Sequence, residues 1–186
     1  MTLTKRSSKG SALSYDEMDG NFTHLGGDGS FHNAGVRVGP PDTILEMLAG
    51  HADGRTLVGH SGSYTLQNVT THQDLTSTHT SIGLDIDYIP PTGTKTVLYE
   101  AQFQFRGMDA DPLLHFQAIW DGNILEPSKS TFRVNAANDI QNLYHLSVAI
   151  ELNSSNVSVT NARIGAWTTA KTLSWTAREY SGSFEG

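Results

Sequence analysis

Pairs of carboxylates are the residues of this chain whose type and spacing first suggest chemistry. Asp85 and Asp87 lie two positions apart on one face of an expected strand, and Asp109 and Asp111 share one expected loop. Enzymes that cleave glycans need two carboxylates facing each other across the glycosidic bond. A third candidate, Glu100, points away from the apolar face of its expected strand. Solvated carboxylates on sheet faces and loops are far more common than catalytic ones. The prediction is therefore that the protein is not an enzyme and has no catalytic residue.

The eight histidines are the second candidate for chemistry, because imidazole is a frequent metal ligand. Two histidines separated by one residue on a strand would share a face, but no pair has this spacing. His72 and His79 are seven positions apart, and Asp109–Asp111 is too short for a known calcium loop. No glycine-rich phosphate loop follows a strand, and no serine-centred nucleophile elbow is present. We therefore predict no metal site and no cofactor.

The three tryptophans are the third candidate, because indole on a loop can stack on a sugar ring. On a strand, tryptophan usually fills a core or a subunit interface instead. Trp175 alternates with Leu173 and is expected in the core, whereas Trp120 and Trp167 adjoin turns and are loop candidates, with core or interface favoured for each. The residues expected to form surface-recognition loops are Asp109, Asp111, Trp120, Asp121, Asn123 and Asn138.

A long strand over Lys95–Arg106 organises the elements that must position these residues. Apolar and polar residues alternate along it, which is the period of a half-buried strand. Its apolar face comprises Val97, Tyr99, Ala101, Phe103 and Phe105. Strands of about five or six residues are usual, and this one is longer. Because its long inward face carries aromatic residues, a second sheet or a partner chain must cover that face.

Further strands are expected on both sides of it. They are a hairpin from Arg55–Val58 and Ser63–Thr70, two short strands or one bent strand in Leu75–Ile89, Leu113–Trp120, a return at Asn123–Leu125, Ser130–Val134, Tyr144–Leu152, a partner starting at Val157, and Thr172–Tyr180. A short helix is expected over Ile44–Leu48, before the strands. Because about eight or nine strands follow without a helix, the fold class is mainly β, a jelly-roll-like antiparallel β-sandwich.

A short helix is predicted near the N-terminus, before a glycine-rich linker. Ser14 and Glu17 have the spacing of a capping box, and Gly26 follows the last apolar residue. The apolar stripe of this helix comprises Tyr15, Met18, Phe22 and Leu25. Since a helix of about three turns is marginal alone, we expect this stripe to pack on symmetry mates or in a socket on a larger particle. The domains are then 1–29 (anchor), 30–62 (linker and neck) and 63–186 (β-sandwich).

Composition narrows the classes of partner. The formal net charge is −7, and an acidic domain repels phosphate, so no nucleic-acid partner is expected. The chain has no cysteine, which excludes disulfides and favours assembly in a reducing cytoplasm. No apolar N-terminal run resembles a signal peptide, and no stretch is long enough to cross a membrane, so no membrane insertion is expected.

Two stretches resemble known protein families. The first comprises Leu3–Lys5, Lys9–Ser14, Glu17–Asp19 and Asn21-Phe22. It resembles the N-terminal segment that recurs in tail-fibre and other appendage proteins of tailed bacteriophages. The second comprises Leu48–Gly50, Asp53–Thr56, Tyr64–Thr70, Tyr88–Thr94, Val97–Glu100, Trp167–Thr172 and Ala177–Tyr180. It resembles a β-domain of structural proteins from aquatic phages and some algal viruses.

The resemblance implies a virion protein that is assembled in the host cytoplasm, is usually homotrimeric and is attached through its N-terminal segment to other virion proteins. The expected function is host adsorption as a tail fibre, with the β-domain meeting a host-surface glycan or protein. One alternative is a capsid-decorating protein or head fibre. Another is a glycan-binding or glycan-cleaving domain.

Overall fold

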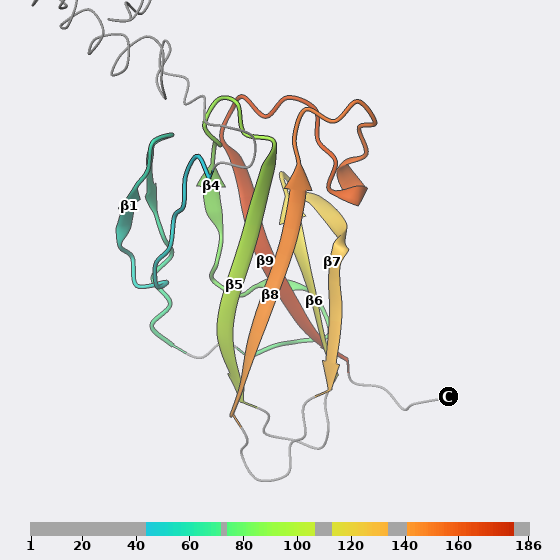
Figure 1. The fold of residues 1–186 in the computed structure, drawn as a ribbon. Coiled ribbons are helices and arrows are strands. Elements are labelled where there is room, and N and C mark those ends of the chain that lie inside the picture. Colours follow the sequence, from blue (N-terminus) through green and yellow to red (C-terminus); the bar gives the residue numbers. More distant parts are fainter. Residues whose placement is uncertain (1–43, 72–73, 107–112, 134–140, 181–186) are drawn as a thin grey trace, which may run out of the picture. The chain divides into compact units, whose positions relative to one another are not determined.

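A computed structural model describes residues 44–71, 74–106, 113–133 and 141–180 (Figure 1). The described residues of Leu48–Pro90 and Thr94–Gly186 form one compact unit, whereas Ile44–Met47 and Pro91–Gly93 belong to a second unit. The first unit therefore begins before residue 63, where the sequence placed the start of the β-domain. The expected N-terminal helix, with Tyr15, Met18, Phe22 and Leu25, lies outside the described residues.

The described part of the chain is mainly β, and all of its paired strands are antiparallel, as predicted. The strands are β1 (Thr56–Val58), β2 (Ser63–Thr65), β3 (Thr80–Ser81), β4 (Ile86–Tyr88), β5 (Thr96–Arg106), β6 (Leu113–Trp120), β7 (Asn123–Arg133), β8 (Gln141–Glu151) and β9 (Lys171–Tyr180). One sheet has the order β3-β9-β6-β7 with β4 also on β9, and β5–β8 and β1–β2 form two-stranded sheets.

The strands from β4 to β9 pair in a nested order. β6 pairs with β7, β5 with β8, and β4 with β9, so the chain forms a long antiparallel ribbon. The ribbon is folded over itself, because β6 also pairs with β9 while β5 and β8 stay in a separate sheet. In Figure 1, β5 and β8 pass in front of β9 and β6.

Aromatic side chains join the two sheets. The ring of Tyr99 stacks on that of Trp175 with 5.8 Å between centroids, and Phe103 and Phe116 are 5.0 Å apart. The fully buried large side chains are Trp175, Phe116, Leu114, Leu125, Ile150 and Leu173. Each such burial stabilises the fold by about 1.5–3 kcal/mol. The predicted inward face of β5 is thus confirmed for its described residues, with Val97 and Ala101 buried.

The turn between β6 and β7 is the hairpin that the sequence predicts most directly. Asp121 and Gly122 have φ angles of 48° and 79°, the left-handed values that a two-residue type I′ turn requires. Asn123 Nδ2 donates to the carbonyl oxygen of Asp121 at 3.0 Å. β7 then continues through Pro127 to Arg133, where two separate strands were expected. Proline is tolerated there because β7 is an edge strand.

The prediction of a short helix over Ile44–Leu48 is wrong, since residues 44–50 have no regular secondary structure. So short a segment cannot form enough helical hydrogen bonds to offset the ordering of its backbone. Within the main unit, the chain at Gly50 lies close to the hairpin side chains. A Cβ placed there would be 2.9 Å from Leu66 Cδ1.

The prediction of a strand that starts at Val157 is also wrong. Val157 is exposed, and a 3₁₀ turn, η2, occupies Val159–Asn161 and ends at Ala162 with φ 56°. The partner of β8 is instead β5, in which Leu98 lies opposite Ala149. Alternation within β8 identifies its apolar face, but it contains no information on which strand lies beside it.

Candidate functional site

The described residues of the predicted recognition surface lie around one end of β6. Trp120, at one end of β6, pairs with Asn123 and with Leu173, whereas Leu113, at the other end, pairs with Arg133 and Tyr180. The eight residues of β6 span roughly 23 Å at about 3.3 Å per residue. Residues 107–112 and 134–140, which include Asp109, Asp111 and Asn138, are outside the described residues.

Trp120 is not a loop residue, which corrects its assignment to the recognition surface. It is the last residue of β6, is 8% exposed, and meets the ring of Trp167 edge-on at 5.5 Å. Trp167, 6% exposed, in turn meets Tyr88 at 5.9 Å. Burial of both indole rings means that neither offers a free face to a sugar, so the core interpretation is correct for both.

Asp121 and Asn123 are exposed, as a recognition loop requires. Asp121 is engaged with its own fold, because Lys171 Nζ lies 2.6 Å from its Oδ2 and 5.9 Å from the centroid of the Trp120 ring. This pair ties the β6–β7 turn to the start of β9. Recognition by Asp121 and Asn123 stays a prediction.

Of the carboxylates considered for catalysis, the three with described positions have separate partners, whereas Asp109 and Asp111 are outside the described residues. Asp85 accepts a hydrogen bond from Ser81 Oγ at 2.8 Å, and Asp87 accepts one from Thr172 Oγ1. Glu100 lies 3.5 Å from His145 across the outer face of β5 and β8. Among the residues with described positions, no group of three or more His, Cys, Asp or Glu side chains can hold a metal ion.

A row of polar side chains on the outer face of the five-stranded sheet was not predicted from the sequence. His115 on β6 lies opposite Arg178 on β9 and Thr131 on β7, and its Nδ1 is 2.9 Å from Thr131 Oγ1. His79 immediately precedes β3, whose Thr80 lies opposite Ala177, the neighbour of Arg178 on β9. Its Nδ1 is 3.3 Å from Thr176 Oγ1. His79, Arg178, His115 and Thr131 are called the histidine–arginine row below.

The row is electropositive although the chain is acidic. Arg178 forms no ion pair with an acidic side chain in the described ranges. Burial lowers the pKa of His79, and the positive charges of Arg178, His115 and Lys129 lower it further. The pKa of His115 is lowered by burial and then by Arg178. Both imidazoles are therefore neutral at pH 7, beside a guanidinium that stays charged.

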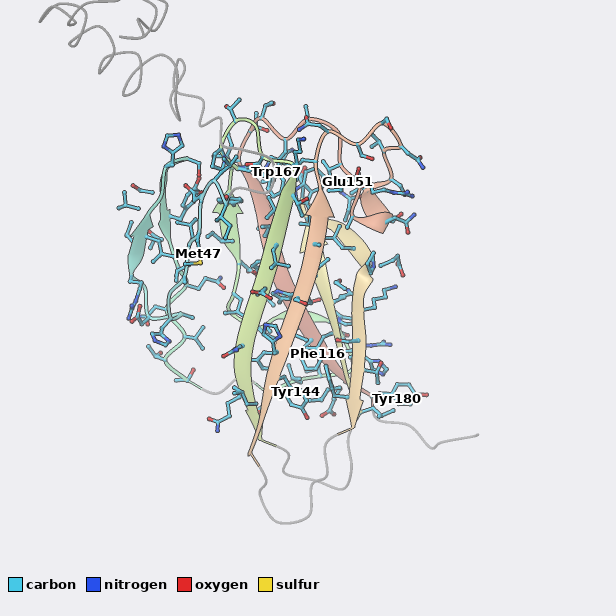
Figure 2. The ribbon with its side chains drawn as sticks, viewed as in Figure 1. Met47, Phe116, Tyr144, Glu151, Trp167 and Tyr180 are labelled. Atoms are coloured by element: carbon cyan, nitrogen blue, oxygen red, sulfur yellow. The ribbon has the colours of Figure 1, made fainter. Side chains whose placement is uncertain are left out.

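Buried polar groups surround the row on the same face. Gln117, Ser174 and Thr176 are 7%, 9% and 5% exposed, and Thr176 Oγ1 donates to the carbonyl oxygen of Gln117 at 3.2 Å. At the edge of the row, Tyr180 is 47% exposed and meets His115 at right angles, with 5.8 Å between centroids. Figure 2 shows Tyr180 and Trp167 at opposite ends of the unit, so Tyr180 and the neighbouring His115 are remote from the Trp120 turn.

Two signals in the sequence point toward this face, but neither is sufficient. Thr176, Arg178 and Tyr180 alternate with the core residues of β9, and His115 and Gln117 do so in β6. Which strand lies beside which cannot be obtained from alternation. The contact between His79 and Thr176 joins residues 97 positions apart.

Comparison with protein-family models, with curated protein sequences and with solved structures gives no match for this chain. No helix in the described ranges is both long and apolar enough to cross a membrane.

Proposed function

We propose that this chain is a structural protein of a phage virion, a homotrimeric tail fibre or fibre-like appendage that adsorbs to the host surface. Its N-terminal segment, with the helix stripe of Tyr15, Met18, Phe22 and Leu25 and the glycine-rich linker, anchors it to other virion proteins. The β-sandwich is displayed outward. The resemblance of both stretches to phage structural proteins supports this assignment.

The fold that we propose for the displayed unit is jelly-roll-like. A jelly roll is a double sheet of eight strands in two Greek keys, built as a long antiparallel ribbon folded over itself. The three nested pairs β4–β9, β5–β8 and β6–β7 support this fold. The two-residue turn at Asp121-Gly122 joins β6 and β7, which would be the innermost strand pair of an eight-stranded ribbon.

The observation that supports association best is the pair of open edges of the β5–β8 sheet. Leu152 N–H donates to Lys95 O at 2.8 Å, which makes Lys95 and Leu152 a hydrogen-bonded pair. Such pairs alternate with pairs whose backbone groups point away from the partner strand. The residues whose N–H and C=O groups therefore point outward include Leu98, Glu100 and Gln102 on β5 and Leu143, His145 and Ser147 on β8.

These edges lack two of the features that keep an edge strand from pairing, namely shortness and proline. β5 and β8 are each 11 residues long and contain no proline, and among the described residues neither has a second strand beside it. Among the residues with described positions, the β8 edge is covered at its end, where Glu151 bonds Ala162 and Ile164. Leu98 and Leu143 are 59% and 71% exposed on the outer face. Long edges of this kind favour pairing with another chain, which a closed ring of copies provides.

The test uses the full chain and a proline at an outward-pointing amide. Ser147→Pro removes an N–H that β5 does not use, so the fold is expected to persist while edge pairing is lost. Ser147→Thr keeps the N–H and is the matched control. Light scattering is expected to give a trimer for the wild type and for Ser147→Thr, and a smaller species for Ser147→Pro. A monomeric wild type contradicts the proposal.

A density map of the intact virion identifies the particle site. Density for this chain at the tail supports the tail fibre. Density on the shell instead supports the capsid-decorating protein or head fibre, and absence from the particle contradicts a virion role.

A further inference from the structure

We propose that the histidine–arginine row binds an acidic saccharide, a sugar unit that carries a carboxylate or a sulfate. The inference rests on the proposed adsorption function, for which it names the chemical class of the host ligand. Its basis is the position of Arg178 between His79 and His115, on a polar face beside an exposed aromatic ring.

The charge of the row selects an anion over a metal cation. Two neighbouring histidines are a common start for a metal site, but here a guanidinium lies between them and repels a cation. Arginine presents a planar fork of N–H donors that matches the two oxygens of a carboxylate or sulfate. Lys129 adds a second positive charge that acts on His79, although it also pairs with Glu126 at 2.7 Å.

The row also holds buried side-chain nitrogens without a partner among the described residues. His115 Nε2 and Arg178 Nε make no hydrogen bond to any part of the chain that the structure describes. A buried polar group without a hydrogen-bond partner is costly to the fold, so small side-chain movements that bring these groups to a ligand are favoured. On the same face, the hydroxyl of Thr176 already donates a hydrogen bond to the carbonyl oxygen of Gln117. This bond orders the polar surface beside the row.

Tyr180 is the feature that favours a sugar over a simple ion. Its ring is half exposed, and it lies on β9 two positions beyond Arg178, on the same face. Aromatic rings offer an apolar face to the C–H groups of a sugar while their edges remain near polar groups. His115 contacts this ring and donates or accepts at Thr131, so one imidazole joins the aromatic and the polar parts of the row.

Binding of an anion should strengthen as the pH falls. The free protein holds His79 and His115 neutral, because burial and nearby positive charges lower the pKa of each. A bound carboxylate or sulfate opposes that effect and favours the protonated rings. The other charged groups near them are Arg178 and Lys129, while Glu179 occupies an inward position opposite Leu114. Each histidine that gains a proton on binding can contribute up to about a tenfold change in Kd per pH unit.

Calorimetry with the full chain tests the ligand class. The probes are an oligogalacturonate, a neutral malto-oligosaccharide of the same length, and inorganic sulfate. The oligogalacturonate is expected to bind, and to bind more tightly at about pH 5.5 than at about pH 7.5, on either side of the ordinary histidine value. Equal binding of the neutral sugar overturns the inference. Sulfate binding as tight as that of the oligogalacturonate overturns the saccharide class.

Substitutions at one residue test the site. Arg178→Gln is expected to weaken oligogalacturonate binding by about tenfold or more, because a charge-assisted pair is lost. Arg178→Lys keeps the charge without the fork, so its affinity should lie between those of the wild type and Arg178→Gln. Lys95→Gln removes one exposed positive charge elsewhere and is the control for net charge. Unchanged binding by a folded Arg178→Gln variant overturns the site.

A histidine variant gives a readout that a purely structural role would not produce. His115→Asn is expected to reduce the pH dependence of the oligogalacturonate Kd, and an unaltered pH slope counts against the row. Failure of the inference is distinguishable from failure of the proposed function. If the virion map places the chain in the particle but no acidic saccharide binds, the inference fails and the virion role stands.

Discussion

The hydroxyl of Tyr99 on β5 donates a hydrogen bond to the carbonyl oxygen of Leu84, in the segment between β3 and β4, at 2.5 Å. The same ring stacks on Trp175 of β9. Tyr99 therefore joins three parts of the main unit that are far apart in the sequence. Burial, and then the charge of Asp85, raise the pKa of Tyr99 well above its usual value, so the donor stays protonated.

Replacing this hydroxyl tests the bond directly. Tyr99→Phe keeps the stacked ring but leaves the Leu84 carbonyl without its donor, which should cost about 1–3 kcal/mol. Tyr180→Phe is the control, because that residue is 47% exposed. Urea denaturation measures both, and equal midpoints for the two variants would rule out a stabilising bond at Tyr99.

Gly83 is expected to tolerate no side chain. Its φ angle is 79°, and a Cβ there would lie 2.3 Å from Val69 Cγ2. Gly122 has the same φ angle but nothing within 4 Å of such a Cβ, so Gly122→Ala measures the backbone strain alone. Strain costs about 1–2 kcal/mol and overpacking about 1–3 kcal/mol more. Gly83→Ala should therefore lower the melting temperature further than Gly122→Ala, and adding Val69→Ala should restore part of the loss.

Ser128 holds the irregular register between β6 and β7. Its Oγ accepts the N–H of Ala118 at 2.7 Å and donates to the carbonyl oxygen of Leu125 at 2.5 Å. Ser128→Ala leaves two buried backbone groups unpaired and should destabilise the fold by about 1–3 kcal/mol or more. Ser130→Ala, on the same strand, removes a buried hydroxyl that has no partner in the described part of the chain. Chemical denaturation should find that variant neutral or slightly stabilised.

The pKa of Asp53 is lowered to about 2 by hydrogen bonds from the Arg55 side chain. A lowered value means that the carboxylate stays ionised as the pH falls, until about pH 2. NMR titration of the Asp53 side-chain carboxyl carbon measures this value. In Arg55→Gln the inflection should move up toward the ordinary value of about 3.9. An unshifted inflection in the variant would exclude Arg55 as the cause.

The strands and the type I′ turn could be predicted because their signals are local. Alternation along β5, β8 and β9 identifies their inward faces, and Asp121-Gly122 suits left-handed backbone angles. The helix over Ile44–Leu48 and the strand at Val157 were wrong for the same reason. Both are short apolar patterns whose conformation depends on neighbours that the local sequence does not specify.

The sequence by itself determined that this is a mainly β chain and which side chains of its long strands face the core, because strand geometry repeats every two residues. Only the tertiary structure decided that Trp120 is buried beside Trp167 and that His79, Arg178 and His115 form one row. Strand order and register depend on contacts between residues far apart in the chain, and no local period encodes them.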